Sequence, residues 1–385
     1  MEEAPLRDIR ELAWFERNLD AAVSSLFLDE NRLIAGDWDG AVHCWNLEGE
    51  RIWKAQTSNR VANFAVGGNH LFAVCGRDIV CMNIESGEIA WEVELEGSSD
   101  LVAALPDGSE IFATSSVFDL EMNDFLESTL WRFDSQGNIL RRDAIDERPW
   151  SIEMRNDGVV FLSLSRPRCG VIRADKEGLH HIQLATSSPA TCGFTGKPHS
   201  VIGHADGTLT GIDGGMVLDD DTYTNQPGSV ESISGSDDGL LVAIAIESGT
   251  AGASFGGAEG IARAYDSNGA LRWQIETPLG CNIEHVSFGP TIEAHSSAWA
   301  ISWDGRTGFT ESRSAIDGSP ILRAEIASRI NCVVGDSEYI GFGFDNGSVI
   351  LLQGELLTRR LSEEVVTEAD EHKSALAEKL RRLRS

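Results

Sequence analysis

Apolar residues in this chain occur in short runs that are separated by polar turn residues, and this pattern continues to about residue 361. Between Leu33 and Trp53 the order is strand, Asp-Gly turn, strand, Gly turn, strand. Asp-Gly pairs between apolar runs are typical of tight hairpins, because both residues tolerate positive φ. Helical periodicity is absent before residue 362. The pattern therefore predicts an all-β chain that ends in a C-terminal α-helix.

The strand–turn unit recurs eight times. Each unit contains a polar residue that is expected to close its third strand, namely Asn46, Asn83, Asp134, Asp175, Asp213, Asp266, Asp317 and Gln353. The mean spacing of these anchors is about 44 residues, which is close to the period of four-stranded propeller blades, whereas solenoid repeats are mostly shorter. We therefore predict an eight-bladed β-propeller.

Three segments follow from this pattern. Residues 1–20 are predicted to close the last blade, residues 21–361 to form the propeller, and residues 362–385 to form an amphipathic helix. The segment 11–16 precedes the first unit just as residues 51–54 precede the second, so it is predicted to be the displaced outer strand of blade eight. Residues 356–361 are the competing candidate. We prefer the N-terminal strand, because it would join the chain ends and protect an open sheet edge.

The repeat resembles two families of propellers. In the segment from Cys81 to Trp91 a polar residue ends one strand, Ser-Gly turns the chain, and a Trp opens the next strand, which resembles the quinoprotein-like propellers with PQQ-like repeats. The segment from Leu33 to Trp45 is similar to the WD-repeat pattern. The resemblance covers roughly residues 21–361 and implies a fold more firmly than a function. Trp53, Trp91 and Trp273 are predicted to pack between neighbouring blades.

Charge and composition narrow the range of partners. The net charge is −30, from 61 Asp and Glu against 31 Lys and Arg, and such a surface repels nucleic acid and anionic lipid. No apolar run of about 18 residues is present, so no membrane span is expected. The first ten residues lack the apolar core of a secretory signal, and seven cysteines form no C-x-x-C pair. We therefore expect an acidic protein of the cytoplasm with free thiols.

No motif for catalysis or cofactor binding stands out. The chain has no G-x-S-x-G, H-E-x-x-H or phosphate-binding glycine pattern, and the acidic segment Ser116–Glu127 lacks the glycine and terminal Glu of a calcium loop. The resemblance to quinone enzymes implies a vicinal cysteine pair and a calcium site, neither of which the sequence shows. We therefore predict no enzyme activity, no cofactor and no metal. The alternative is a propeller that binds a small ligand or acts as a quinone-type oxidoreductase at its central channel.

The predicted function is a scaffold for protein–protein interactions, with the oligomeric state and the identity of the partners left open. The candidate interface residues are Arg166, Arg168, Phe255 and Trp303 in loops expected on one face, together with Leu376, Leu380 and Leu383 in the C-terminal helix. Aromatic and Arg side chains are the usual interface anchors. For the helix, two interpretations remain: it packs on its own propeller, or it docks to a partner or a second copy.

Overall fold

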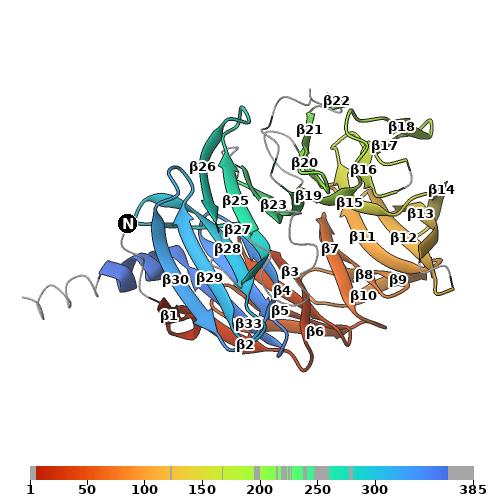
Figure 1. Cartoon of the computed structure of the whole chain (residues 1–385). Coiled ribbons are helices and arrows are strands. Elements are labelled where there is room, and N and C mark those ends of the chain that lie inside the picture. Colours follow the sequence, from red (N-terminus) through yellow and green to blue (C-terminus); the bar gives the residue numbers. More distant parts are fainter. Residues whose placement is uncertain are drawn as a thin grey trace, which may run out of the picture.

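The computed structural model describes residues 6–121, 124–166, 168–194, 200–213, 216–217, 223, 226, 228–236, 241–246, 260–276 and 281–362. Its strands form eight sheets around a common axis, and strands from the start of the chain lie beside strands from its end (Figure 1). The first strand of each sheet contacts the first strand of the next sheet all the way round the ring. The fold is therefore the predicted eight-bladed β-propeller, with a helix at its C-terminal end.

Blades 1 to 4 follow the chain from inner strand to outer strand. Blade 1 consists of β3 (Val23–Leu28), β4 (Arg32–Asp37), β5 (Ala41–Asn46) and β6 (Arg51–Gln56). Blade 2 consists of β7 (Val61–Gly67), β8 (His70–Cys75), β9 (Asp78–Asn83) and β10 (Ile89–Glu94). Blade 3 consists of β11 (Ser98–Ala104), β12 (Glu110–Asp119), β13 (Asp124–Asp134) and β14 (Ile139–Ile145). Blade 4 consists of β15 (Pro149–Met154), β16 (Val160–Leu164), β17 (Val171–Ala174) and β18 (Leu179–Ile182).

Blades 5 to 8 repeat this order, with one exchange at the end. Blade 5 consists of β19 (Ala190–Phe194), β20 (Ser200–His204), β21 (Leu209–Asp213) and β22 (Met216–Val217). Blade 6 consists of β23 (Ser229–Gly235), β24 (Leu241–Ile246), β25 (Gly260–Tyr265) and β26 (Leu271–Glu276). Blade 7 consists of β27 (Asn282–Ile292), β28 (His295–Trp303), β29 (Gly308–Ser314), β30 (Pro320–Ile326) and the added strand β1 (Leu6–Asp8). Blade 8 consists of β31 (Ile330–Gly335), β32 (Tyr339–Phe344), β33 (Ser348–Gln353) and β2 (Phe15–Asn18).

The N-terminal segment completes the ring. Strand β2 lies antiparallel to β33, with Phe15 opposite Leu351 and Asn18 opposite Ser348, and so forms the outer strand of blade 8. The strand is shorter than the predicted segment 11–16 and begins later, because residues Ile9–Leu12 form a 3₁₀ helix, η1. Strand β1 pairs in parallel with β30 of blade 7, which the sequence pattern did not indicate. Residues 6–18 therefore pair with two neighbouring blades.

The C-terminal helix begins earlier than predicted. Residues 354–362 are helical, so the helix starts eight residues before residue 362 and takes in the alternative strand 356–361. Residues 356–361 cannot form the outer strand of blade 8, because β2 already pairs with the free edge of β33. Leu356 and Leu357 are buried instead, and Leu357 packs in one apolar cluster with Ile9 and Leu12 of η1. This part of the helix is packed on its own propeller.

Tryptophans in the outer strands of blades 1, 2 and 6 each bind the next blade. The indole Nε1 of Trp53 in blade 1 donates a hydrogen bond of 2.9 Å to the carbonyl oxygen of Ile84 in blade 2. The ring packs against Gly87, whose φ is 72° and where a Cβ would lie 2.5 Å from the indole. Glycine is therefore required at this turn. Trp91 and Trp273 make the equivalent hydrogen bond to their next blades, at 3.1 and 3.0 Å, which confirms their predicted packing role.

The polar anchors close the blades for a local reason. Seven of the eight end a third strand or follow it directly, whereas Asp317 lies three residues beyond the end of β29. The Oδ1 atom of Asp134, for example, accepts hydrogen bonds of 2.9 Å from the backbone N–H groups of Gln136 and Asn138. Asp and Asn recur here because their short side chains cap the turn. The sequence repeat thus reflects an Asp or Asn side chain that caps the turn after the third strand in most blades.

Candidate functional site

Every inner strand carries a β-bulge near its first residues. At this point the strand contains one extra residue relative to its neighbour, and these residues are Ser24, Ala62, Asp100, Trp150, Thr191, Glu231, Glu284 and Asn331. All eight lie toward the same face of the ring, because each blade repeats the same strand order. We call this the loop face; it is formed by the connections between second and third strands and by those between blades.

Most of these bulge residues link one blade to the next. Ser24 Oγ, Thr191 Oγ1 and Asn331 Nδ2 each donate to a backbone carbonyl oxygen of the next inner strand, belonging to Val61, Val230 and Val23. The carboxylates of Asp100 and Glu284 form ion pairs with Arg148 and Arg329, which lie just before the next inner strand. The usual task of this position is therefore to hold adjacent blades together.

Trp150 departs from this pattern in blade 4. Its side chain is 43% exposed, and no hydrogen bond to its indole Nε1 is found within the part of the chain that the structure describes. Ala62 and Glu231 also make no such link among the described residues, but neither presents an apolar ring to solvent. An exposed aromatic side chain, at a position that links blades in five of the other seven, makes Trp150 a candidate binding residue.

Arg148 connects Trp150 to blade 3. Its guanidinium carbon lies 4.6 Å from the centre of the Trp150 ring and 4.3 Å from the centre of the Phe125 ring. The same guanidinium pairs with Asp100 at 2.8 Å. The charge is thus held between two aromatic rings and a carboxylate, which fixes the position of Trp150 relative to β13.

The β12–β13 hairpin rises above blade 3 next to this cluster. Strand β11 pairs with β12 only as far as Ser116, and β14 pairs with β13 only from Ser128. The hairpin itself continues to the pair Asp119–Asp124. We call the described residues of this part, 117–121 and 124–127, the hairpin extension. Its exposed apolar side chains are Val117, Phe118, Leu120 and Leu126, and Leu120 is 88% exposed. An apolar projection of this kind is typical of an interaction site.

The connection between β16 and β17 carries two predicted interface residues, Arg166 and Arg168, and both are exposed. Neither has an ion-pair partner among the described residues. Cys169, which follows them, has φ of 58°, an uncommon value for a residue other than glycine. Its backbone N–H donates to the buried Glu147 at 2.9 Å, and His181 Nε2 lies 2.6 Å from its carbonyl oxygen. The connection is therefore held firmly against the end of β14.

The other predicted interface residues do not join this cluster. Trp303 ends β28 in blade 7, where it is half-buried on the loop face, three blades away from Arg166. Phe255, Leu376, Leu380 and Leu383 lie outside the described residues. The structure thus brings Arg166 and Arg168 near Trp150, through a hydrogen bond of 3.2 Å between the N–H of Ser165 and the carbonyl oxygen of Arg148.

A cavity of about 500 Å³ opens beside Trp150 in the central channel. The inner strands of blades 2 to 5 line it, with Phe64, Val102, Ile152 and Met154 among the apolar side chains. Within their described bounds, the eight inner strands contain four carboxylates and no Lys or Arg. The channel is therefore apolar on this side, and two of the four carboxylates, Asp100 and Glu284, are ion-paired with Arg148 and Arg329.

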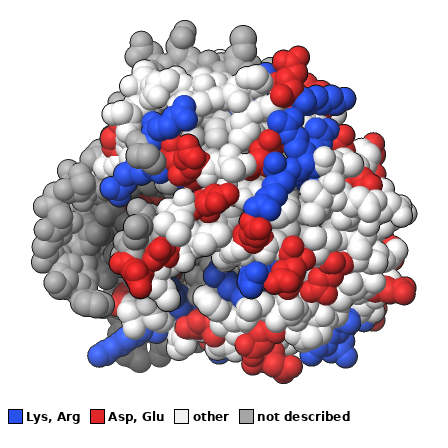
Figure 2. Space-filling view, turned by 90° about the vertical axis from the view of Figure 1, so that its right-hand side faces the viewer, with Lys and Arg blue, Asp and Glu red and all other residues white. Residues whose placement is uncertain are grey.

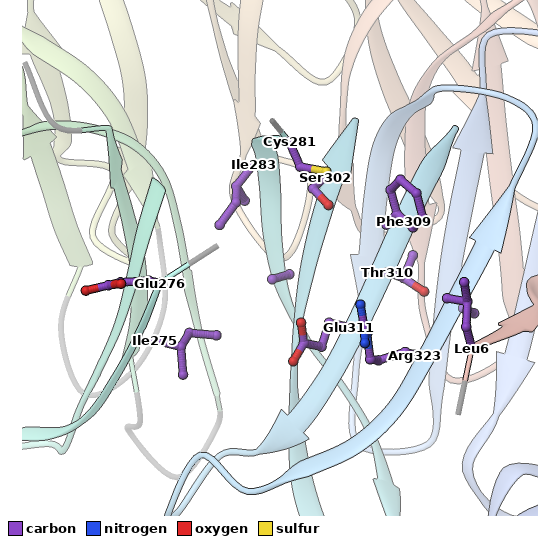
Figure 3. A pocket seen from close by; sticks show the side chains of 12 residues that line it. Leu6, Ile275, Glu276, Cys281, Ile283, Ser302, Phe309, Thr310, Glu311 and Arg323 are labelled. Carbon is purple, nitrogen blue, oxygen red and sulfur yellow. The ribbon is translucent and has the colours of Figure 1, made fainter. Parts of the chain in front are cut away.

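A smaller cavity of about 120 Å³ lies between blades 6 and 7. Figure 3 shows Phe309, Ile283 and Cys281 around it, with Leu6 at one side. Glu311 and Arg323 are directly opposite each other on β29 and β30. The walls are mostly apolar, and the space is part of the contact between two blades rather than of the loop face.

Charged side chains are spread over the side of the ring that bears β13, β14, β17 and β18 (Figure 2). Lys and Arg gather in a line there, and Asp and Glu lie among them. Several form ion pairs, including Arg142 with Glu96 and Arg173 with Asp175. Exposed pairs of this kind contribute little to stability. This side therefore lacks the uniform charge that would attract a polyanion.

Three buried cysteines of blades 1 and 2 carry unreactive thiols. Burial raises the pKa of Cys44, Cys75 and Cys81 to about 12, so these thiols stay protonated and unreactive at neutral pH. Within the described residues, no group of three or more His, Cys, Asp and Glu side chains lies close enough together to hold a metal ion. Nor does any described helix have both the length and the apolar character needed to cross a membrane.

The sequence analysis did not predict a role for Trp150 or Arg148. A bulge adds one residue and inverts the alternation of inward and outward side chains, so a period of two cannot show which way Trp150 points. Comparing the eight units with one another would have singled out Trp150, because the equivalent position in the other seven units holds a smaller residue. The segment 116–127 was considered in the sequence for its acidic residues as a calcium loop, and its exposed apolar side chains were not considered.

Eight blades around a central channel, with capped turns in the blades and tryptophan contacts at several blade junctions, define a propeller of the PQQ-like and WD-repeat class. The model of the family described as outer membrane protein assembly factor BamB matches residues 38–249, which is more than half of the chain. The chain therefore belongs to this family. Curated proteins give no match to the sequence.

Solved structures of other propellers have the same fold. The computationally designed Ika8 protein gives a TM-score of 0.64 at 16% identity, covering 91% of this chain and 100% of that one. Sqt1 of Saccharomyces cerevisiae gives 0.65 at 11% identity, covering 92% and 99%. BamB of Moraxella catarrhalis gives 0.64 at 13% identity, covering 88% and 96%. At these identities the likeness shows the fold alone.

Proposed function

We propose that this protein is a non-catalytic scaffold that binds protein partners through the loop face of blades 3 and 4. The observation that carries the proposal is Trp150, an exposed aromatic residue at a position where five other blades use a polar link. The hairpin extension and the exposed pair Arg166 and Arg168 surround it. Trp and Arg are enriched among the residues that dominate binding energy at interfaces.

The family supports this role. Its description names a protein assembly factor, and a factor of this kind acts on other proteins. A rigid ring with variable loops suits such a task, because binding residues on loops are positioned by the scaffold beneath them. The partner class is protein, since a net charge of −30 disfavours nucleic acid and anionic membranes.

We also propose a reducing compartment, the cytoplasm, as the place of action. The seven cysteines are free thiols in the structure, and a chain without disulfides suits a reducing environment. Fractionation of native cells with an antibody against the chain tests this. Recovery outside the cytoplasmic fraction would contradict the proposal without affecting the binding surface.

Affinity capture from a native extract tests the scaffold role. The bait is the full chain, compared with Trp150→Thr, which places at this position the side chain that links blades at Thr191. The control is Trp38→Ala, since Trp38 is another exposed Trp on the loop face, in blade 1. We expect loss of partner with Trp150→Thr and retention with Trp38→Ala. Equal recovery by all three baits would refute the proposed surface.

The remaining predicted residues are compared in the same assay. Arg166→Glu with Arg168→Glu tests the β16–β17 connection, and Phe255→Ala with Trp303→Ala tests the rest of the loop face. Replacing Leu376, Leu380 and Leu383 by Ser tests the C-terminal alternative. Loss of partner in this last variant alone would move the binding site from the loop face to the C-terminal segment.

A further inference from the structure

Two neighbouring blades each contribute one wall of the mouth of the central channel beside the cavity. One wall is the hairpin extension of blade 3, and the other is Trp150 at the start of the inner strand of blade 4. Arg148 holds the two at a fixed distance, since it stacks on Phe125 at 4.3 Å and on Trp150 at 4.6 Å. The cavity of about 500 Å³ lies directly beneath, with Trp150 in its lining. A segment of chain that crosses the mouth would contact all three features.

The apolar character of these features predicts an apolar anchor on the ligand. Phe118 and Leu126 of the hairpin extension are 43% and 51% exposed. Phe64, Val102 and Ile152 present further apolar surface inside the cavity. Covering this surface with an aliphatic or aromatic side chain is favourable, at roughly 25 cal/mol per Å² buried. The indole N–H of Trp150 adds a donor for a backbone carbonyl.

The charges predict the flanking residues of the ligand. The hairpin extension contains four carboxylates, Asp119, Glu121, Asp124 and Glu127, and no Lys or Arg. The inner strands add Asp100, Glu153, Glu231 and Glu284, again without a base. Asp100 is paired with Arg148 and Glu284 with Arg329, whereas Glu231 is exposed. The exposed bases Arg166 and Arg168 belong to the blade 4 side of the mouth. On the blade 3 side, the four carboxylates of the hairpin extension, together with the net charge of −30, favour a cationic segment over an acidic one.

We propose that the channel mouth binds an extended segment of a protein partner in which apolar residues alternate with Lys or Arg. One apolar side chain enters the cavity against Trp150, and the basic side chains face the carboxylates of the hairpin extension and the channel. This assignment rests on the proposed function, since it names the kind of partner that the loop face takes. A second copy of the chain is disfavoured, because two acidic hairpin extensions would repel each other.

Peptide binding tests the assignment directly. The probe is a fluorescein-labelled Lys-Leu-Lys-Phe-Lys-Leu-Lys peptide with blocked ends, followed by fluorescence anisotropy with the full chain. One control peptide has Glu in place of every Lys, and another has Ser in place of Leu and Phe. We expect the basic apolar peptide to bind at least tenfold more tightly than either control, and more weakly as salt rises. Equal binding of the acidic peptide would overturn the proposal.

Two variants locate the peptide on the structure. Trp150→Thr removes one wall, with Trp38→Ala as its matched control. The second variant replaces residues 117–127 by Asn-Gly; Ser116 and Ser128 are directly paired, with their Oγ atoms 2.9 Å apart, so a two-residue turn closes the shortened hairpin. Each variant should weaken the basic peptide at least fivefold while the far-ultraviolet spectrum is unchanged. Wild-type affinity in both variants would refute the site.

A chain ending at residue 362 tests the other occupants. The segment 379–384 of this chain is itself basic and apolar. If removing residues 363–385 raises peptide affinity several-fold, the chain's own C-terminal segment occupies the site and the partner assignment is wrong. If sedimentation shows dimers that disappear with the shortened hairpin, the occupant is a second copy. Capture of native partners that needs Trp150 but ignores peptide charge would uphold the scaffold and refute only this assignment.

Discussion

The indole Nε1 of Trp14 donates a hydrogen bond of 2.7 Å to the carbonyl oxygen of Leu47. Trp14 precedes the outer strand of blade 8, and Leu47 follows the third strand of blade 1. This is the contact that Trp53, Trp91 and Trp273 make between consecutive blades. The first and last blades are thus joined by the same contact that joins blades 1 and 2, blades 2 and 3, and blades 6 and 7.

Trp14→Ala should weaken the closure of the ring. The change removes a hydrogen bond and a large ring that is about two-thirds covered, and we expect a loss of about 2 kcal/mol in unfolding free energy. Urea unfolding followed by circular dichroism measures this, with Trp38→Ala as the control because Trp38 is half exposed. Deleting residues 1–18 should cost more and cause aggregation, since the edge of β33 is then open. Equal unfolding midpoints would contradict the role of this segment.

Leu357→Ala tests how firmly the C-terminal helix is packed. Leu357 is fully buried in the cluster that contains Ile9 and Leu12, so the substitution leaves a cavity between the two chain ends. We expect a loss of about 3 kcal/mol. The exposed Glu355→Ala on the same helix serves as the control. If the two variants unfold at the same urea concentration, the helix is not part of the core.

The number of blades and the fold class could be predicted from the sequence, because both depend on turn residues whose preferences are local. Gly40, Gly207, Gly305 and Gly347 all have φ between 85° and 95° in the hairpins where Asp-Gly or Asn-Gly pairs predict them. The preference of Gly, Asn and Asp for such turns depends on the local backbone conformation and requires no contact with distant segments. Eight repetitions of such a signal are enough to predict the number of blades and the fold class.

What the sequence did not show depends on contacts between distant segments. Strand β1 has only three residues, and nothing in Leu6–Asp8 indicates parallel pairing with β30. Residues 356–361 fit both a strand and a helix, and the competition was decided by β2, which fills the edge of β33. The same holds for the proposed binding cluster: the sequence analysis named Arg166 and Arg168 as interface candidates, whereas the role proposed for Trp150 depends on comparing it with the equivalent residues of the other seven blades.

The buried thiols should be inert while the protein is folded. Burial raises the pKa of Cys44, Cys75 and Cys81 to about 12, so almost no thiolate exists at pH 8. Iodoacetamide at pH 8, followed by peptide mass spectrometry, should leave these three residues unlabelled in native protein and label them fully in urea. Rapid native labelling of any of them would show that its blade opens locally.

Acid should weaken the blades through their turn carboxylates. Hydrogen bonds from the backbone and hydroxyl of Ser319 lower the pKa of Asp317 from 3.8 to about 2, and the pKa values of Asp134 and Asp266 are lowered by similar bonds. A carboxyl with a lowered pKa in the folded state stabilises the fold fully above its ordinary pKa, and the contribution is lost as pH falls toward the folded value. The urea concentration at the unfolding midpoint should therefore fall as the pH is lowered from 4 to about 2.

Asp317→Asn tests this contribution. The Asn side chain keeps an acceptor but cannot titrate, so the midpoint of this variant should fall less than that of the wild type. The control variant Glu48→Gln should follow the wild type. Identical acid dependence in Asp317→Asn and wild type would contradict the role of this turn.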